Sequence, residues 1–237
     1  LPEGVPIVRF VDEELTQCMS DYVVANVTLH HRCHSRYVAD QSNRQWTQFY
    51  PAPAWDTHVG IMGLGELGLD AARRLLPLGF KVRGWSRSAH QIPEVSSFSG
   101  PDGFGEFLSG TDILVNLLPL TPETENILCM KTFKQLRRDG LQGGPVIINA
   151  ARGGHQNEVD IVAALNDGTL GAASLDVFKI EPLPQDSPLW RAPNIYLTPH
   201  IAAISNPDSG AAYFARVLLE HEAGKALPNV IDVARGY

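Results

Sequence analysis

From residue 58 onward, short apolar runs alternate with amphipathic segments. The runs have the length and composition of buried strands, and the segments between them carry apolar residues at helical steps of three and four. The pattern predicts strands at 58–62, 80–85, 112–118, 145–149, 171–176 and 194–198. It predicts helices at 66–76, 104–109, 130–138, 156–166 and 207–223. Alternation of this kind predicts an α/β fold, in which helices cover both faces of a doubly wound parallel sheet.

The first part of the chain has a different pattern. A short strand is predicted at 7–11 and a helix at 12–35, where apolar residues recur at three- and four-residue steps. Segment 36–57 is polar, aromatic and interrupted by prolines, so we expect a loop there. Segment 88–103 is rich in serine, proline and glycine and predicts a second long loop.

Composition narrows the class of protein. The chain has 237 residues, of which 44% are hydrophobic and 19% charged, as expected of a globular protein with a sizeable core. Its formal net charge of −7 argues against a nucleic-acid partner, because phosphate backbones repel an acidic surface. No apolar run approaches the roughly 20 residues that span a bilayer, so we expect no membrane association. Three scattered cysteines predict reduced thiols and a cytoplasmic location.

The sequence Gly-Leu-Gly-Glu-Leu-Gly at 63–68 lies between a predicted strand and a predicted helix. This placement is typical of a dinucleotide site in a Rossmann-type sheet. We expect Gly63 to allow the tight turn, Gly65 to let the backbone approach a pyrophosphate, and Gly68 to let the helix pack on the strand. The free N–H groups of the helix start would face the phosphates. A glycine turn without a ligand is the simpler alternative.

Three candidate catalytic side chains each follow one of the last three predicted strands: Arg152, Glu181 and His200. An arginine can hold a carboxylate through two hydrogen bonds. A histidine can transfer a proton near neutral pH, and a nearby carboxylate orients it and favours its charged form. Each residue alone has an ordinary explanation, as a cap, a solvated carboxylate or a hydrogen-bonded histidine. Together at the carboxyl ends of strands in one chain, they indicate a keto-acid reductase.

Five motifs occur in a fixed order along the chain. They are the glycine motif at 63–68, Leu-Pro-Leu-Thr-Pro-Glu-Thr at 118–124, Asn-Ala-Ala-Arg-Gly at 149–153, Leu-Asp-Val-Phe at 175–178 followed by Glu-Pro-Leu-Pro at 181–184, and Thr-Pro-His-Ile-Ala at 198–202. In these motifs the chain resembles the D-isomer-specific 2-hydroxyacid dehydrogenases over essentially its whole length. Trp-Ser-Arg-Ser at 85–88, Pro-Leu-Trp-Arg at 188–191 and the C-terminal Ala-Arg-Gly-Tyr are most similar to the glyoxylate/hydroxypyruvate reductase A group of that family.

The resemblance implies roles for particular residues. Arg152, Glu181 and His200 would form the catalytic set, and Asp176 would lie near the nicotinamide. The cofactor contacts implied are Gly63, Gly65, Glu66, Leu67, Gly68, Ser86, Arg87, Ser88, Leu118, Pro119, Thr124, Ala150, Asp176 and Ala202. The family also implies a homodimer, with the helix at 12–35 in the subunit interface.

The end of the second central strand indicates which dinucleotide is used. An NAD site usually carries an acidic residue there, which accepts hydrogen bonds from the ribose hydroxyls. Here the strand ends in Ser86, Arg87 and Ser88, without a carboxylate. An arginine and two hydroxyls favour a 2′-phosphate, so the sequence predicts NADP rather than NAD.

The resemblance also implies two domains. Residues 12–203 would form the dinucleotide-binding domain, and residues 1–11 and 204–237 would be remnants of a substrate domain whose N-terminal part is missing. We therefore expect this chain by itself to bind cofactor but to be a poor catalyst, because one side of the substrate would lack its positioning groups.

The leading hypothesis is NADPH-dependent reduction of small 2-keto acids such as glyoxylate and hydroxypyruvate to 2-hydroxy acids. The alternative is an NAD(H)-sensing binding protein of the corepressor type, which shares the fold and a similar catalytic set. A formate dehydrogenase-like member is less favoured, because that group has Gln where Glu181 stands. His30 and His34 lie one helical turn apart, but no further ligand completes a metal site, and none is predicted.

Overall fold

The computed structural model describes residues 5–10, 13–204 and 207–231. Seven strands in this part of the chain form one parallel sheet in the order β3-β2-β1-β4-β5-β6-β7. The strands are β1 (His58–Met62), β2 (Lys81–Ser86), β3 (Val95–Ser99), β4 (Ile113–Asn116), β5 (Val146–Asn149), β6 (Ala172–Leu175) and β7 (Ile195–Leu197). The strand order reverses direction between β1 and β4, as in a doubly wound sheet. The predicted fold class is confirmed.

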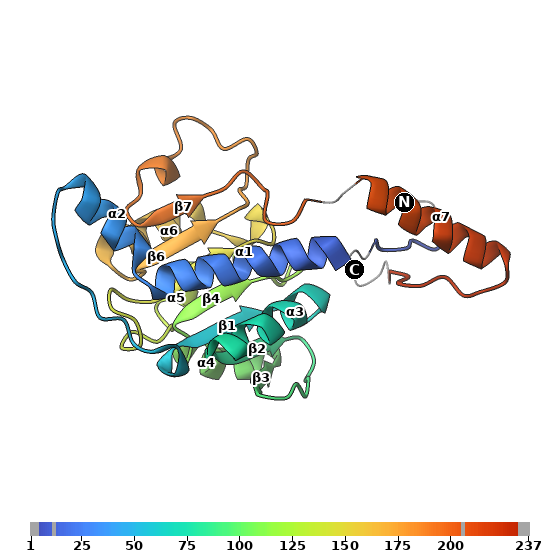
Figure 1. Ribbon diagram of the computed structural model, residues 1–237, viewed down its shortest axis with the longest axis horizontal. Helices are drawn as coiled ribbons and strands as arrows, with labels where there is room; N and C mark the ends of the chain where they lie inside the picture. The colour runs from blue at the N-terminus through green and yellow to red at the C-terminus, as the bar shows by residue number, and fades with distance from the viewer. Residues whose placement is uncertain (1–4, 11–12, 205–206, 232–237) are drawn as a thin grey trace.

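Helices cover both faces of this sheet (Figure 1). They are α1 (Glu13–His31), α2 (His34–Ser42), α3 (Glu66–Leu75), α4 (Gly100–Ser109), α5 (Met130–Phe133), α6 (Glu158–Asp167) and α7 (Pro207–Glu222), with short 3₁₀ turns η1 (Ala54–Asp56), η2 (Leu76–Leu78), η3 (Gly153–His155) and η4 (Pro188–Arg191). On one face, α1 and α3 bury Val27 and Leu75 against the strands. On the other, α4, α5 and α6 bury Phe107, Phe133 and Ile161. Because both faces are covered, every residue of β4 and β5 is buried.

Helix α7 stands apart from the sheet, with the N-terminal segment beside it (Figure 1). Val8 pairs with Val230 in an isolated antiparallel bridge. The Phe10 ring lies 5.2 Å from that of Tyr213 and 5.8 Å from that of Phe214, measured between centroids. Within the described residues, the segment 5–10 therefore packs on α7 and on the segment that follows it. Their assignment to a second domain, and the domain boundaries, stay predictions.

Several predicted elements differ from those observed. The helix predicted at 12–35 is interrupted at Cys33, whose φ of 57° is left-handed, and α2 begins at His34 and extends to Ser42, within the segment predicted as loop. His30 and His34 therefore lie on different helices. The segment 88–103 contains β3 and the start of α4.

Strand β3 reads Val-Ser-Ser-Phe-Ser, and this polar pattern is tolerated because it is the edge strand of the sheet. Helix α5 makes only one turn of the helix predicted at 130–138. Of the strand predicted at 7–11, only Val8 pairs, and residue 11 lies outside the described residues. The remaining boundaries shift by one or two residues. Within the described residues, no helix is long and apolar enough to cross a membrane.

Candidate active site

The glycine loop connects β1 to α3 and has no room for side chains at Gly63 and Gly68. Gly63 has a φ of 97°, and its N–H donates to the carbonyl of Trp85 at 2.8 Å, which ties the loop to the end of β2. A Cβ on Gly63 would lie 2.8 Å from the carbonyl oxygen of Leu117, and one on Gly68 would overlap the carbonyl of Gly63. A Cβ on Gly65, the N-cap of α3, would meet nothing within 4 Å. The loop therefore leaves open space at the N-terminus of α3, where the amide groups favour an anion.

The two residues after this N-cap differ in their surroundings. Glu66 is exposed in the first turn of α3. Leu67 packs against a small cluster formed by Met19, Ala150 and Ala202. Of the predicted cofactor contacts, Leu67, Ala150 and Ala202 are thus brought together, where the glycine loop meets the segments that follow β5 and β7.

The turn after β2 holds the residues predicted to select NADP. The hydroxyl of Ser86 is buried and donates to the carbonyl of Ser88 at 2.7 Å, so it shapes the turn. Arg87 and Ser88 are exposed. The pKa of Glu123 lies below its usual value, chiefly through a hydrogen bond with Thr121, and the charge of Arg87 adds to this effect. Arg87 therefore acts electrostatically on the loop that follows β4.

That loop carries three further predicted cofactor residues. Leu118 is buried, and its N–H donates to Oδ1 of Asn116. The Thr124 hydroxyl donates to the carbonyl of Pro119 at 2.9 Å and accepts from the N–H of Thr121 at 2.8 Å. The hydroxyl of Thr124 thus closes the turn of its own loop.

Glu181 and His200 form a hydrogen-bonded pair. Nδ1 of His200 lies 2.8 Å from Oε2 of Glu181, while Oε1 of Glu181 accepts from the N–H of Phe178 at 2.9 Å. Partial burial raises the pKa of Glu181, but the hydrogen bonds from His200 and Phe178 outweigh it and leave the pKa below its usual value. The side chains of His200 and Glu181 are 46% and 37% exposed. With Nδ1 engaged, Nε2 is the ring nitrogen that can meet a substrate.

Asp176, directly after β6, holds the loop that carries His200. Its backbone carbonyl accepts from the N–H of His200 at 2.8 Å. Its carboxylate accepts from the N–H groups of Ile201 and Ala202, both at 2.9 Å, and from the hydroxyl of Thr198 at 2.6 Å. These bonds fix a loop in which His200 has a left-handed φ of 56°. Asp176 is 1% exposed, and its carboxylate is turned toward this loop.

Arg152 follows β5 and is exposed. Its Nη1 donates to the carbonyl of Ala151 at 2.6 Å. Its charge is also among those that lower the pKa of Glu181, after the effects of burial, His200 and Phe178. The guanidinium therefore acts electrostatically on Glu181 at the carboxyl edge of the sheet.

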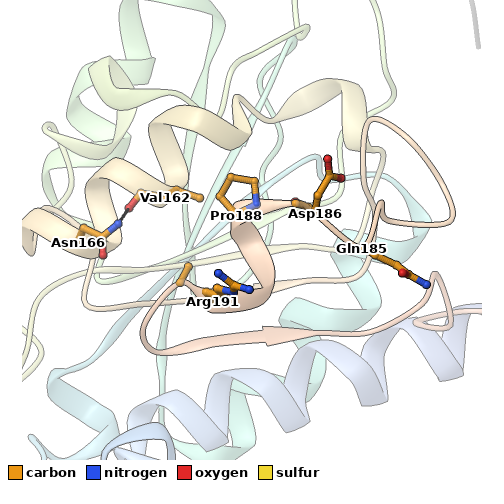
Figure 2. A pocket seen from close by; sticks show the side chains of 8 residues that line it. Val162, Asn166, Gln185, Asp186, Pro188 and Arg191 are labelled. Atoms are coloured by element: carbon orange, nitrogen blue, oxygen red, sulfur yellow. Dashed lines mark hydrogen bonds between the residues drawn. The ribbon is translucent and has the colours of Figure 1, made fainter.

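A surface pocket of about 490 Å³ lies elsewhere, between α6 and η4 (Figure 2). Its lining residues are Val162, Asn166, Gln185, Asp186, Ser187, Pro188, Arg191 and Ala192. Figure 2 shows the amide of Asn166 turned back to the carbonyl of Val162, to which it donates at 2.9 Å. None of the predicted catalytic or cofactor residues lines this pocket, so the candidate site is defined by the strand ends instead.

Comparison with known proteins identifies the family. Residues 24–202 match the model of the NAD binding domain of D-isomer specific 2-hydroxyacid dehydrogenases. The chain belongs to this family. All of it aligns with 74% of a glyoxylate/hydroxypyruvate reductase A from Serratia proteamaculans, at 42% identity over 237 residues.

Solved structures of this dehydrogenase family agree with the match. The NADPH-dependent glyoxylate/hydroxypyruvate reductase of Sinorhizobium meliloti, in complex with NADP and sulfate, has a TM-score of 0.96 and 46% identity. A probable 2-hydroxyacid dehydrogenase of Rhizobium etli, in complex with NADP, HEPES and L(+)-tartaric acid, has a TM-score of 0.95 and 47% identity. Both comparisons cover 100% of this chain and 74% of the other.

In this dehydrogenase, buried amide side chains that the sequence reasoning missed tie the loops of the site together. Nδ2 of Asn116 donates to Oδ1 of Asn149 at 3.0 Å, and Nδ2 of Asn149 donates to Oε1 of Gln156 at 2.8 Å. Nε2 of Gln156 in turn donates to the carbonyl of Val177 at 2.9 Å. All three amide side chains are fully buried. The chain of bonds links the ends of β4, β5 and β6. The sequence signal for this network was the asparagine at the end of each of the apolar strands β4 and β5.

His155 was also missed. It is fully buried, and its Nδ1 lies 3.1 Å from the carbonyl oxygen of Arg152, while its Nε2 lies 3.2 Å from that of Pro119. Burial lowers the pKa of His155 below its usual value, although the two carbonyls act in the opposite direction. The ring thus spans the gap between the backbone of the predicted catalytic arginine and the loop after β4.

Proposed function

We propose that this chain is an NADPH-dependent reductase of small 2-keto acids, with glyoxylate and hydroxypyruvate as substrates. The observation that carries the proposal is the 2.8 Å contact between His200 and Glu181. It lies at the carboxyl edge of a parallel sheet whose strand β1 leads into a glycine loop. The activities named for the relatives support the same function. They do not favour the alternative of a dinucleotide-sensing binding protein.

Each proposed catalytic residue has a defined task. NADPH, when bound, supplies the hydride that the keto carbon receives. Arg152 holds the substrate carboxylate and polarises the carbonyl. Nε2 of His200 gives its proton to the carbonyl oxygen, which becomes the hydroxyl of the product. Glu181 holds Nδ1–H and stabilises the positive charge of the ring before the proton leaves. In the reverse direction His200 takes the proton back.

The proposed cofactor site runs along the switch point of the sheet. Gly63, Gly65 and Gly68 would let the pyrophosphate approach the N-terminus of α3. Arg87 and Ser88 would receive the 2′-phosphate, since residues 86–88 contain no carboxylate that would repel it. The remaining proposed contacts are Glu66, Leu67, Ser86, Leu118, Pro119, Thr124, Ala150, Asp176 and Ala202.

The test measures NADPH binding and NADPH oxidation separately. Titration of NADPH fluorescence should show binding by the wild type and by His200→Gln with the same Kd. Oxidation of NADPH with glyoxylate, hydroxypyruvate or pyruvate should occur with the wild type and fall by a factor of at least about 100 with His200→Gln. Equal oxidation by the two proteins would refute the assignment of His200. Preference for NADH over NADPH in kcat/KM would refute the cofactor assignment.

We further propose a homodimer formed through α2 and the segment after it. The apolar face of α1 is covered by the protein's own sheet, whereas Trp46, Tyr50 and Trp55 are 95%, 80% and 70% exposed. Large exposed aromatic residues are typical of subunit interfaces. Light scattering should give the mass of a dimer, and Trp46→Ser combined with Tyr50→Ser should give a monomer. A wild-type monomer at micromolar concentration would contradict this proposal.

Two further assignments go with this function. We propose that residues 12–203 form the dinucleotide-binding domain and that 1–11 and 204–237 belong to a substrate domain. We also propose a cytoplasmic location, consistent with free thiols at Cys18, Cys33 and Cys129.

A further inference from the structure

A tyrosine on α1 reaches the loop of the proposed catalytic histidine. The Tyr22 hydroxyl lies 2.9 Å from Oγ1 of Thr198, 176 positions further along the chain. Thr198 in turn donates to Oδ1 of Asp176 at 2.6 Å. A threonine hydroxyl has one proton, and a carboxylate only accepts, so Tyr22 must be the donor to Thr198. The hydrogen bonds therefore run in one direction, from Tyr22 through Thr198 to Asp176.

This chain of bonds ends where the His200 loop is held. The carboxylate of Asp176 accepts hydrogen bonds from the Thr198 hydroxyl and from the N–H groups of Ile201 and Ala202. These bonds fix residues on both sides of His200. The left-handed φ of 56° at His200 is unfavourable for a residue with a Cβ, and the surrounding bonds must maintain it. Tyr22 contributes to them from outside the loop.

The surroundings of Tyr22 suit a permanent donor. Burial raises the pKa of Tyr22 to about 12, an effect that the hydrogen bond with Thr198 partly opposes. The hydroxyl therefore keeps its proton throughout the neutral and mildly alkaline range. Tyr22 also packs beside Met19 against the cluster that contains Ala150 and Ala202, which holds its ring in place.

We propose that Tyr22 is a positioning residue for His200, acting through Thr198 and Asp176. This inference rests on the proposed function, because it assigns to Tyr22 a part in the placement of the proton donor. Its hydroxyl orients the Thr198 hydroxyl toward Asp176, and Asp176 then holds the loop in the geometry that proton transfer needs. The glycine loop and the turn after β2 are not part of this arrangement.

Tyr22→Phe removes only the hydroxyl. We expect kcat for glyoxylate reduction to fall by about three- to tenfold, the range of one net hydrogen bond. The Kd of NADPH should not change. Hydrogen–deuterium exchange of the Ile201 and Ala202 amides should become faster, and this second measurement does not depend on turnover.

Ser20→Ala is the matched control on the same helix. Ser20 is fully buried and donates to Oδ2 of Asp70 at 2.6 Å, which ties α1 to α3 rather than to the His200 loop. We expect Ser20→Ala to lower Tm as Tyr22→Phe does, but to leave kcat and the exchange of the Ile201 and Ala202 amides unchanged. Equal effects of the two variants on kcat and exchange would overturn the proposal.

Substitutions of Thr198 complete the test. Thr198→Ser keeps the hydroxyl and should retain most of the wild-type kcat, whereas Thr198→Val should lose at least as much as Tyr22→Phe. The effects of Tyr22→Phe and Thr198→Val should be non-additive, because both break one chain of bonds. Additive effects would overturn the proposal. Turnover by the wild type tests the proposed function, and amide exchange decides separately whether Tyr22 holds the loop.

Discussion

Glu181→Gln gives a sharp test of the proton-transfer pair, because Glu181 uses its two oxygens differently. One accepts from the N–H of Phe178 and the other from Nδ1 of His200. A glutamine has one carbonyl oxygen and keeps only one of these bonds as an acceptor. If the amide oxygen stays with Phe178, the NH₂ group faces Nδ1, and this arrangement disfavours a proton there. The substitution therefore removes both the negative charge and the correct acceptor.

The size of the effect follows from distance and exposure. Two unit charges about 4 Å apart interact by about 1 kcal/mol in water and about 4 kcal/mol at an effective dielectric constant of 20. With side chains 46% and 37% exposed, the value for the His200–Glu181 pair lies toward the lower end. We expect a loss of about 1.5 kcal/mol, which is roughly a tenfold fall in kcat/KM for reduction at neutral pH.

The charge state of Glu181 determines the direction of the effect on the rate of reduction. The pKa of Glu181 is below its usual value, so the carboxylate is charged throughout the neutral range. Reduction needs a proton on the His200 ring, and the charged carboxylate favours that proton, so Glu181→Gln should lower the rate of reduction. Initial rates of NADPH oxidation with glyoxylate from mildly acidic to alkaline pH measure this, with the Kd of NADPH as control. A profile that matches the wild type within about twofold at every pH would refute the reasoning.

Four other substitutions test the cofactor site and the core. Gly68→Ala should lower the free energy of unfolding by about 3 kcal/mol in chemical denaturation, because its Cβ would overlap the carbonyl of Gly63. Gly65→Ala should lower the free energy of unfolding by less than about 1 kcal/mol, but it should weaken NADPH binding in fluorescence titration. Arg87→Ala should raise the KM of NADPH by about tenfold or more and leave that of NADH nearly unchanged. His30 has a pKa lowered by burial from 6.5 to about 4, so its contribution to stability is complete above 6.5 and is lost as the pH falls toward 4. Between neutral pH and pH ~5 the wild type should therefore lose about 2 kcal/mol more than His30→Gln, and equal losses would contradict this.

The central part of the fold was predictable because burial makes its pattern strong. Strands such as β4 and β5 are covered on both faces, and a strand of that kind must be apolar throughout. The same logic explains the failure at β3, an edge strand in which serines are accommodated. The break at Cys33 is a left-handed backbone conformation at a single non-glycine residue, and no local pattern in the sequence predicts it.

The candidate site was predictable only as far as local chemistry marks it. Arg152, Glu181 and His200 stand out because they lie in the loops that follow apolar strands. The bonds from Tyr22 to Thr198 and from Gln156 to Val177 join residues on different elements, so their partners follow from the fold and not from local spacing. The bond from the Ser86 hydroxyl, a proposed cofactor contact, to the carbonyl of Ser88 likewise follows from the turn after β2 and not from local chemistry.

The end of β6 explains how the two sides of the proposed site keep a fixed separation. Asp176 holds the loop of His200 through its carbonyl and its carboxylate. The next residue, Val177, offers its carbonyl to Gln156, which lies in the same loop as Arg152. The loops that carry the proposed proton donor and the proposed carboxylate-binding arginine are therefore anchored at adjacent residues of one buried strand end. Because a buried polar group left without its partner costs about 1–3 kcal/mol, neither loop can move alone without breaking such a bond. Because the two loops are held at a fixed separation, a small keto acid can be oriented through few direct contacts.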